Sequence, residues 1–257
     1  MKELIELDLG DLGWALGLIA CAVALSSWQK LDLEGQFIMA AGRSILQLLG
    51  VGYLLAIIFA LNHPWPVLAI VGIMLTIATV VASNRIFPQK RDLFPVIWLS
   101  LLVSGAFTLS YTLALIIQPP QWYSPQYLIP LVGMVLGNSM NSAALSGERL
   151  ASTIDKNRLE VETHLCLGAT VRQAIRPFQR EAIRIALIPI LNQMMVVGLV
   201  SLPGMFTGQV LSGSNPLNAA SYQILILFMI ALTNLIASLL VTEGVYRRFF
   251  NQNSQLI

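Results

Sequence analysis

Long uninterrupted apolar runs, separated by short polar stretches, are the dominant pattern along this chain of 257 residues. As an α-helix, about 20 consecutive apolar residues cover the roughly 30 Å hydrocarbon core of a bilayer. The runs do not alternate apolar with polar positions, which is the pattern of a membrane β-barrel. We therefore expect an all-α integral membrane protein with seven transmembrane helices, at residues 12–28, 37–61, 65–83, 93–117, 127–146, 182–211 and 219–242.

Composition agrees with this pattern, since 56% of the residues are hydrophobic and 11% are charged. The mean hydropathy of +0.73 lies outside the range of water-soluble domains, so we treat residues 1–257 as a single transmembrane domain. The first run could instead be a cleaved signal peptide, but Lys2 is the one basic residue before it, among several acidic ones. Pro203 and Gly204 predict a kink or an unwound stretch towards the outer end of the sixth run.

Lysine and arginine residues fall in alternate loops, and cytoplasmic loops carry these residues in excess. Basic residues follow the first, third, fifth and seventh runs, whereas Lys2 stands alone on the opposite side. This asymmetry predicts that the N-terminus is outside, that the C-terminus is cytoplasmic, and that the chain is a multi-pass protein of the cell (inner or plasma) membrane. The net charge of +2 is small and its basic residues serve orientation, so no nucleic-acid partner is expected.

The segment 148–181 is the one substantial polar stretch, and its pattern predicts a cytoplasmic helix, an elbow and a second helix between the fifth and sixth spans. Its first half is amphipathic, with apolar residues at helical spacing: Leu150, Ile154, Val161 and Leu165. Gly168 ends this helix, and Thr170 with Gln173 forms a capping box that begins the next. The second helix carries an arginine stripe, which either meets anionic head groups or docks on a protein partner.

The elbow resembles the EAA loop of ABC transporter permeases, in which a Glu is followed six residues later by a Gly. Here these residues are Glu162 and Gly168, with Thr163 and His164 in place of two alanines. A wider resemblance covers nearly the whole chain and is to the FetB (YbbM) family of bacterial iron-export permeases and plant permeases linked to aluminium tolerance. It is carried by the runs IPLVGMVLGNSMN (129–141), LSGERL (145–150), NQMMVVGLV (192–200), LPGMFTGQ (202–209) and YQ (222–223).

The resemblance implies a transporter rather than an enzyme, built from two copies of this permease and two copies of a cytoplasmic ABC ATPase. No phosphate loop of the form GxxxxGK[ST] occurs in the sequence, so ATP and Mg²⁺ are expected on the ATPase and no cofactor on this chain. The residues implied to contact the ATPase are Glu162, Leu165, Gly168, Ala169, Thr170, Arg172 and Arg176. The implied cargo is a metal ion or metal complex, with iron as the first candidate. The alternative cargo is a nucleotide sugar or other small organic solute.

Polar side chains gather in the last three apolar runs, where they are costly unless they face a pathway or another helix. Seven of them are candidates for a substrate pathway: Asn138, Ser139, Asn141, Asn192, Gln193, Gln209 and Gln223. Hydrogen bonds between helices, each contributing about 0.6 kcal/mol, are the alternative role for these side chains.

Iron prefers carboxylate or imidazole ligands, and the predicted spans contain almost none of either. Ligands for a buried iron site are therefore scarce. A metal cargo could therefore travel as a complex. Thioethers suit Cu(I) but also fill apolar cores, and four of them are weak candidates for a metal site: Met140, Met194, Met195 and Met205.

Two other classes of function stay open as alternatives, and both are weakened by the absence of residues that they commonly use. An ion-coupled secondary transporter uses an acidic residue near the middle of the membrane, and no run carries one at its centre. An intramembrane enzyme needs a catalytic set at membrane depth, such as paired aspartates or Ser with His, and the runs carry neither.

Overall fold

The computed structural model describes residues 8–61, 63–86, 93–251 and 255–256. The regular structure in these residues is helical, with two isolated β-bridges and no strand. The chain forms two compact units, one made of the first 62 residues with 211–213 and the other of the remainder. Each unit is described on its own below.

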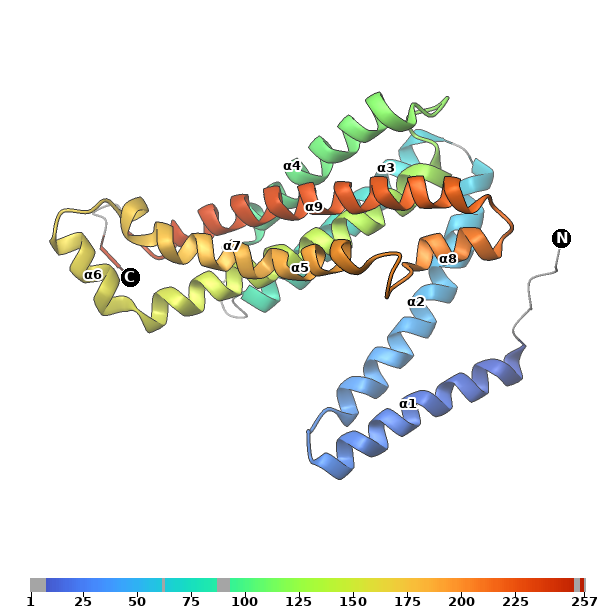
Figure 1. Ribbon diagram of the computed structural model, residues 1–257, viewed down its shortest axis with the longest axis horizontal. Coiled ribbons are helices and arrows are strands. Elements are labelled where there is room, and N and C mark those ends of the chain that lie inside the picture. Colours follow the sequence, from blue (N-terminus) through green and yellow to red (C-terminus); the bar gives the residue numbers. More distant parts are fainter. Residues whose placement is uncertain (1–7, 62, 87–92, 252–254, 257) are drawn as a thin grey trace. The chain divides into compact units, whose positions relative to one another are not determined.

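The first unit is a helical hairpin of α1 (Leu9–Gln29) and α2 (Glu34–Leu61), drawn in blue in Figure 1. Asp8 caps α1, and its N–H donates to Asp11 Oδ2 at 3.0 Å. At the other end, Lys30 adopts a left-handed conformation with a φ of 53° and ends the helix. The buried Ser26 hydroxyl donates to Glu34 Oε1 at 2.9 Å and so joins the two helices at the turn.

Large apolar side chains of the hairpin are exposed. Examples are Trp14, Leu18, Trp28, Leu46, Leu48 and Tyr53. Apolar surface of this extent is unfavourable in water and suits contact with lipid tails or with another membrane chain.

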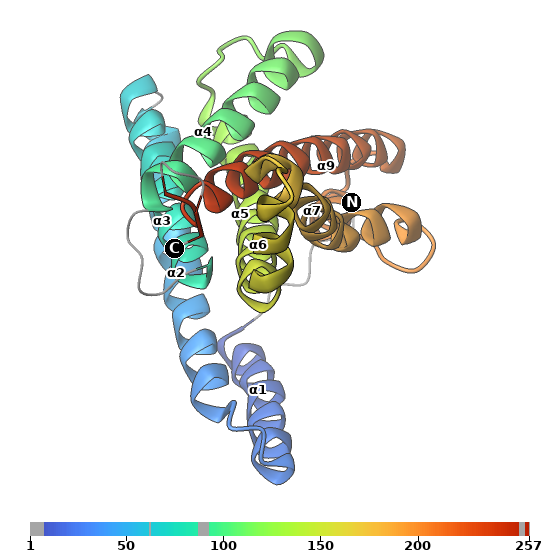
Figure 2. The same cartoon turned by 90° about the vertical axis from the view of Figure 1, so that its left-hand side faces the viewer.

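The second unit is a bundle around α5 (Pro125–Lys156) and α9 (Pro216–Tyr246), which lie side by side in Figures 1 and 2. Half or more of the most apolar stretch of each is buried, 56% for α5 and 50% for α9, against 28% for α3 and 33% for α4. These two helices therefore form the centre of the bundle. The others are α3 (Pro64–Ile86), α4 (Phe94–Tyr111) with a π-helix at Thr112–Ile117, α6 (Arg158–Cys166), α7 (Val171–Val196) and α8 (Gly204–Leu211).

The apolar core of the bundle joins α5, α7 and α9. Its buried members are Leu131, Val135, Ile190, Ile226, Leu227, Met229 and Ile230. Small residues let the helices approach closely outside this core. A Cβ at Gly147 of α5 would lie 2.6 Å from Ile86 Cδ1 of α3, so only glycine fits this contact without a shift of the neighbour.

Five of the predicted spans coincide with helices long and apolar enough to cross a membrane. These are Glu34–Phe59, Pro64–Ile86, Phe94–Ile117, Pro125–Lys156 and Pro216–Tyr246. The first predicted span is helical, but its apolar part, Gly13–Gln29, is shorter. The all-helical class is confirmed, whereas the count of seven spans and their orientation stay predictions.

The sixth predicted span, 182–211, is not one continuous helix. Helix α7 ends at Val196, the chain turns through Gly198 with a φ of 80°, and α8 begins at Gly204. The N–H of Gly198 donates to the carbonyl of Ser201 at 3.0 Å, so the turn satisfies part of its own backbone. The break predicted at Pro203 and Gly204 is confirmed.

The first helix of segment 148–181 also differs from the expectation. Residues 148–156 are the last turns of α5, so the apolar positions assigned to one amphipathic helix belong to two. The break is at Asn157, whose Nδ2 donates to the carbonyl of Thr153 at 2.8 Å. A side chain that bonds the preceding turn competes with continuation of the helix.

Replacing Gly147 by valine should destabilise the bundle, because the new side chain must displace Ile86 from the contact between α3 and α5. We expect Gly147→Val to lower the stability by about 1–3 kcal/mol, measured as a lower Tm in detergent. Gly72→Val is the matched control, since no atom lies within 4 Å of a Cβ at that exposed position of α3. An equal Tm for the two variants would contradict the close packing.

Candidate functional site

A polar cavity of about 190 Å³ lies between α5, α7 and α9, with the end of α3 at one side. Its lining is rich in amides and carries one guanidinium group. The lining residues are Arg85, Asn138, Asn141, Ser142, Leu145, Ala186, Pro189, Ile190, Gln193 and Asn234. The cavity therefore offers hydrogen-bond donors and acceptors between otherwise apolar helices.

The hydrogen bonds of the lining are incomplete. Asn138 Nδ2 donates to the carbonyl of Met134 at 2.8 Å, and Ser142 Oγ donates to the carbonyl of Ala186 at 3.4 Å. Asn234 is only 3% exposed, and its Oδ1 has no hydrogen-bond partner in the described part of the chain. An unsatisfied buried carbonyl costs about 1–3 kcal/mol, so this atom is a natural contact for a polar group that enters the cavity.

Two ion pairs connect the helices that border the cavity. Arg85 Nε lies 3.2 Å from Glu148 Oε2, which links α3 to α5, and Arg149 lies 3.5 Å from Glu181, which links α5 to α7. All four side chains are about half exposed, so each pair contributes at most about 1 kcal/mol. Arg85 was not among the sequence candidates, since its charge was read only as a signal of orientation.

The seven pathway candidates do not share one site. Asn138, Asn141 and Gln193 line the polar cavity. Ser139 is fully buried and donates to the carbonyl of Leu136, while Asn192 is exposed. Two candidates lie elsewhere: Gln209 in a second cavity, and Gln223 buried on α9.

The second cavity has a volume of about 260 Å³ and is lined mainly by apolar and aromatic side chains. It is formed by Ile117, Gln126, Tyr127, Pro130, Leu131, Met134, Met205, Gln209 and Tyr222. Of the thioether candidates, Met205 lines this cavity and Met195 is 69% exposed, while Met140 and Met194 are half-buried. Within the described residues, no group of three or more His, Cys, Asp or Glu side chains could hold a metal ion.

The predicted elbow is present in the structure. Helix α6 ends at Cys166, and Gly168 takes a φ of +88°, which a residue with a Cβ adopts only under strain. The capping box that begins α7 is confirmed: Gln173 N–H donates to Thr170 Oγ1 at 3.3 Å, and Thr170 N–H donates to Gln173 Oε1 at 2.8 Å.

The surface of the elbow combines apolar and basic groups. Leu159 and Leu167 are about 80% exposed, Glu162 is exposed, and Leu165 and Ala169 are half-buried. Beside them, a hollow of about 330 Å³ is lined by Thr170, Arg172, Gln173, Arg176 and Gln179. Exposed leucines next to guanidinium groups are typical of a protein-binding surface.

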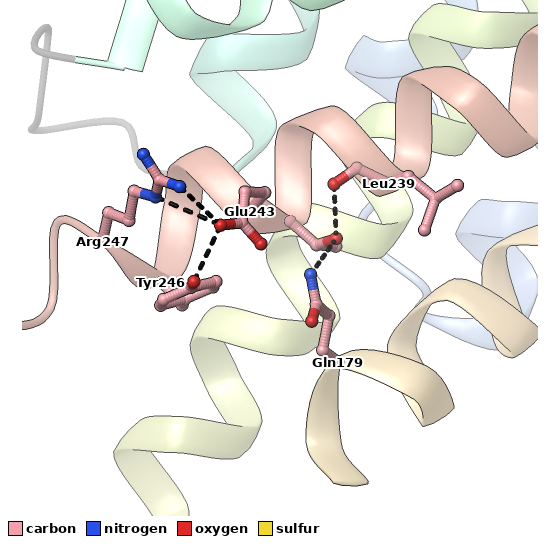
Figure 3. A network of polar contacts seen from close by, with 6 residues as sticks. Gln179, Leu239, Glu243, Tyr246 and Arg247 are labelled. Carbon is pink, nitrogen blue, oxygen red and sulfur yellow. Dashed lines mark hydrogen bonds and ion pairs between the residues drawn. The ribbon is translucent and has the colours of Figure 1, made fainter. Parts of the chain in front are cut away.

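Helix α7 connects the elbow to the polar cavity without a break, from Val171 beside the hollow to Gln193 in the cavity. Gln179 of α7, labelled in Figure 3, reaches towards α9. Its Nε2 donates to the buried hydroxyl of Thr242 at 3.2 Å. The next residue of α9, Glu243, accepts from Tyr246 at 2.8 Å and from Arg247 at 2.7 Å. The hydrogen bond to Glu243 raises the pKa of Arg247, which stays charged at the end of the bundle.

These features define a multi-pass helical membrane protein with a polar cavity among its helices and a helical elbow at one end. The chain belongs to the family described as an uncharacterised protein family, UPF0014, whose model matches residues 9–250. The resemblance to FetB-type permeases is thereby confirmed, and the membrane location with it.

Relatives cover nearly the full length of the chain. The UPF0014 membrane protein slr1647 of Synechocystis is 63% identical over 99% of this chain and 98% of that protein. The probable iron export permease protein FetB of Escherichia coli is 34% identical over 96% of this chain and 94% of its own length. Protein ALUMINUM SENSITIVE 3 of Arabidopsis thaliana is 35% identical over 94% of this chain and 87% of its own length. No solved structure matches the chain.

Replacing Asn234 by leucine should stabilise the protein, because it removes a buried carbonyl without a partner. We expect Asn234→Leu to raise the Tm in detergent, in line with a penalty of about 1–3 kcal/mol. Asn192→Leu, at an exposed position of α7, should melt like the wild type. A lower Tm for Asn234→Leu would show that this amide is already satisfied inside the bundle.

Proposed function

We propose that this chain is the membrane permease subunit of an ATP-driven ABC transporter that exports a metal complex. Iron is the first candidate for the metal. It acts as a homodimer bound to two copies of a separate cytoplasmic ATPase, with its N-terminus outside and its C-terminus in the cytoplasm. The observation that carries this proposal is the exposed elbow at Gly168, which continues through α7 into the polar cavity.

The elbow has the chemistry of a docking element. Leu159 and Leu167 would fill an apolar pocket of the ATPase, and the basic hollow at Arg172 and Arg176 would meet acidic side chains. Because α7 continues from Thr170 to the cavity, past Pro177 and Pro189 inside the helix, a displacement of its capped start would be passed on to the cavity end. The bond from Gln179 to Thr242 carries the same displacement to α9.

ATP and Mg²⁺ belong on the ATPase in this proposal. The permease has no phosphate loop, and its part is to bind cargo and to change conformation. This division assigns no chemical step and no bound cofactor to the permease.

The chemistry of the polar cavity favours a complexed metal over a bare ion. Amides, one hydroxyl and the guanidinium group of Arg85 form the polar lining, whereas iron prefers carboxylate and imidazole ligands. Donor groups of this kind hydrogen-bond to the oxygen atoms of a chelating ligand that already holds the metal. The FetB relative, a probable iron export permease, supports iron as that metal.

A small organic solute such as a nucleotide sugar is the second candidate cargo. The same amide groups would hydrogen-bond to its hydroxyl groups, and Arg85 would pair with a phosphate.

A substitution that strains the elbow should uncouple the permease from its ATPase. We expect Gly168→Val to weaken association with the ATPase about fivefold, as a loss of about 1 kcal/mol at the interface would, and to lower ATPase activity in nanodiscs. Gly213→Val is the matched control: Gly213 has the same φ of +88° and no atom within 4 Å of a Cβ, but lies outside the elbow. Intact association and activity in Gly168→Val would refute the coupling role.

Cells that lack the protein should accumulate iron, and the wild-type gene should restore the normal iron content. Asn141→Leu, which removes an amide from the cavity, should fail to restore it, whereas Asn192→Leu, at an exposed position of α7, should succeed. The measurement is total cellular metal by mass spectrometry, with membrane levels of each variant as the control. Unchanged iron, manganese and copper in the deletion strain would exclude metal export.

A further inference from the structure

A groove of about 430 Å³ runs between α4 and the end of α9, and its lining shares no residue with the polar cavity or the elbow hollow. It is lined by Val96, Leu99, Ser100, Val103, Leu240, Glu243, Gly244, Arg247 and Arg248. The side chain of Val96 packs against the backbone of Gly244, so the two helices touch at this end. The groove is open to the outside of the bundle, because Leu99, Val103 and Leu240 are 36–56% exposed.

The groove separates apolar from charged groups along its length. Leu99, Val103 and Leu240 lie at the level of the spans, while the two arginines follow the last residue of α9. The single hydroxyl of the lining, Ser100 Oγ, already donates to the carbonyl of Val96 at 2.7 Å. The walls therefore offer an apolar surface with cationic groups at one end.

The described residues leave the charge at that end unbalanced. Glu243 is occupied by Arg247 and Tyr246 (Figure 3). Arg248 is exposed, and no acidic side chain among the described residues pairs with it. Among the described residues, one positive charge thus remains available beside the apolar groove, and it favours a lipid whose head group carries a net negative charge.

We propose that the α4–α9 groove binds one anionic phospholipid, with an acyl chain along Leu99, Val103 and Leu240 and the head-group phosphate on Arg248. A phospholipid matches this layout. Its acyl chain would lie along the apolar walls, and its anionic phosphate, joined to that chain, would lie at the end of the groove that carries Arg248. Arginine is suited to the phosphate, since its guanidinium group donates two parallel hydrogen bonds to it. By the distribution of basic residues, the lipid belongs to the cytoplasmic leaflet, which is rich in anionic head groups.

The site is tested by native mass spectrometry of the full-length protein in detergent, titrated with phosphatidylglycerol or with phosphatidylcholine of the same acyl chains. The wild type should retain one phosphatidylglycerol per chain in preference to phosphatidylcholine. Arg248→Gln should weaken phosphatidylglycerol binding roughly fivefold and leave phosphatidylcholine unchanged. Arg180→Gln, at an exposed arginine of α7 outside the groove, should leave both unchanged.

Filling the groove provides a second, independent variant. Val103→Trp should remove the bound phosphatidylglycerol while Arg248 is intact, and its Tm reports whether the chain is folded. If Val103→Trp does not fold, the comparison of Arg248→Gln with Arg180→Gln decides. Equal retention of the two lipids by the wild type, or equal losses in Arg248→Gln and Arg180→Gln, would overturn the proposal. Retention of phosphatidylglycerol by folded Val103→Trp would also overturn the proposal. The finding that a second copy of the chain covers the groove would do the same.

Discussion

Hydrocarbon cannot hydrogen-bond to a peptide group, and this constraint governs the elements of the chain. Each apolar stretch satisfies its backbone as a helix, and the backbone leaves the helix only where local groups replace the lost bonds. At the turn after α7, the N–H of Gly198 bonds to Ser201, and at Asn157 a side-chain amide bonds to Thr153. Side-chain hydroxyls within the spans follow the same rule, since those of Ser100 and Thr108 donate to carbonyls one turn earlier.

Buried polar atoms that lack a hydrogen-bond partner are exceptions to this rule. The carbonyl of Asn234 and the hydroxyl of Ser238 are buried on α9 without a partner in the described part of the chain. Asn234 lies in the polar cavity, where α5 and α7 add three further amides. A bundle that only needed stability would place leucine there, and in the proposed transporter this carbonyl would be a contact for the cargo.

The sequence predicted five spans well because length and continuous hydropathy are properties of each segment alone. The elbow was predicted for the same reason, since Gly168 and the Thr170–Gln173 box act within a few residues. The polar cavity could be predicted only in part. Arg85 meets Glu148 across 63 positions of sequence, and the packing of α3 on α5 that joins them has no local signal. Asn192 and Gln193 are neighbours, yet only Gln193 reaches the cavity, because adjacent residues on a helix point about 100° apart.

The position of the groove on α9 relates lipid contact to the rest of the mechanism. Glu243 and Gly244 line the groove, while Thr242, the preceding residue, accepts the hydrogen bond from Gln179 on α7. One turn of α9 therefore faces the groove on one side and the elbow helix on the other. A displacement of α7 by a bound ATPase would act on this turn through Gln179, and a lipid in the groove would act on it through Arg248. The two contacts would bias the same helix end, so the lipid composition of the membrane would alter how strongly the elbow moves the cavity.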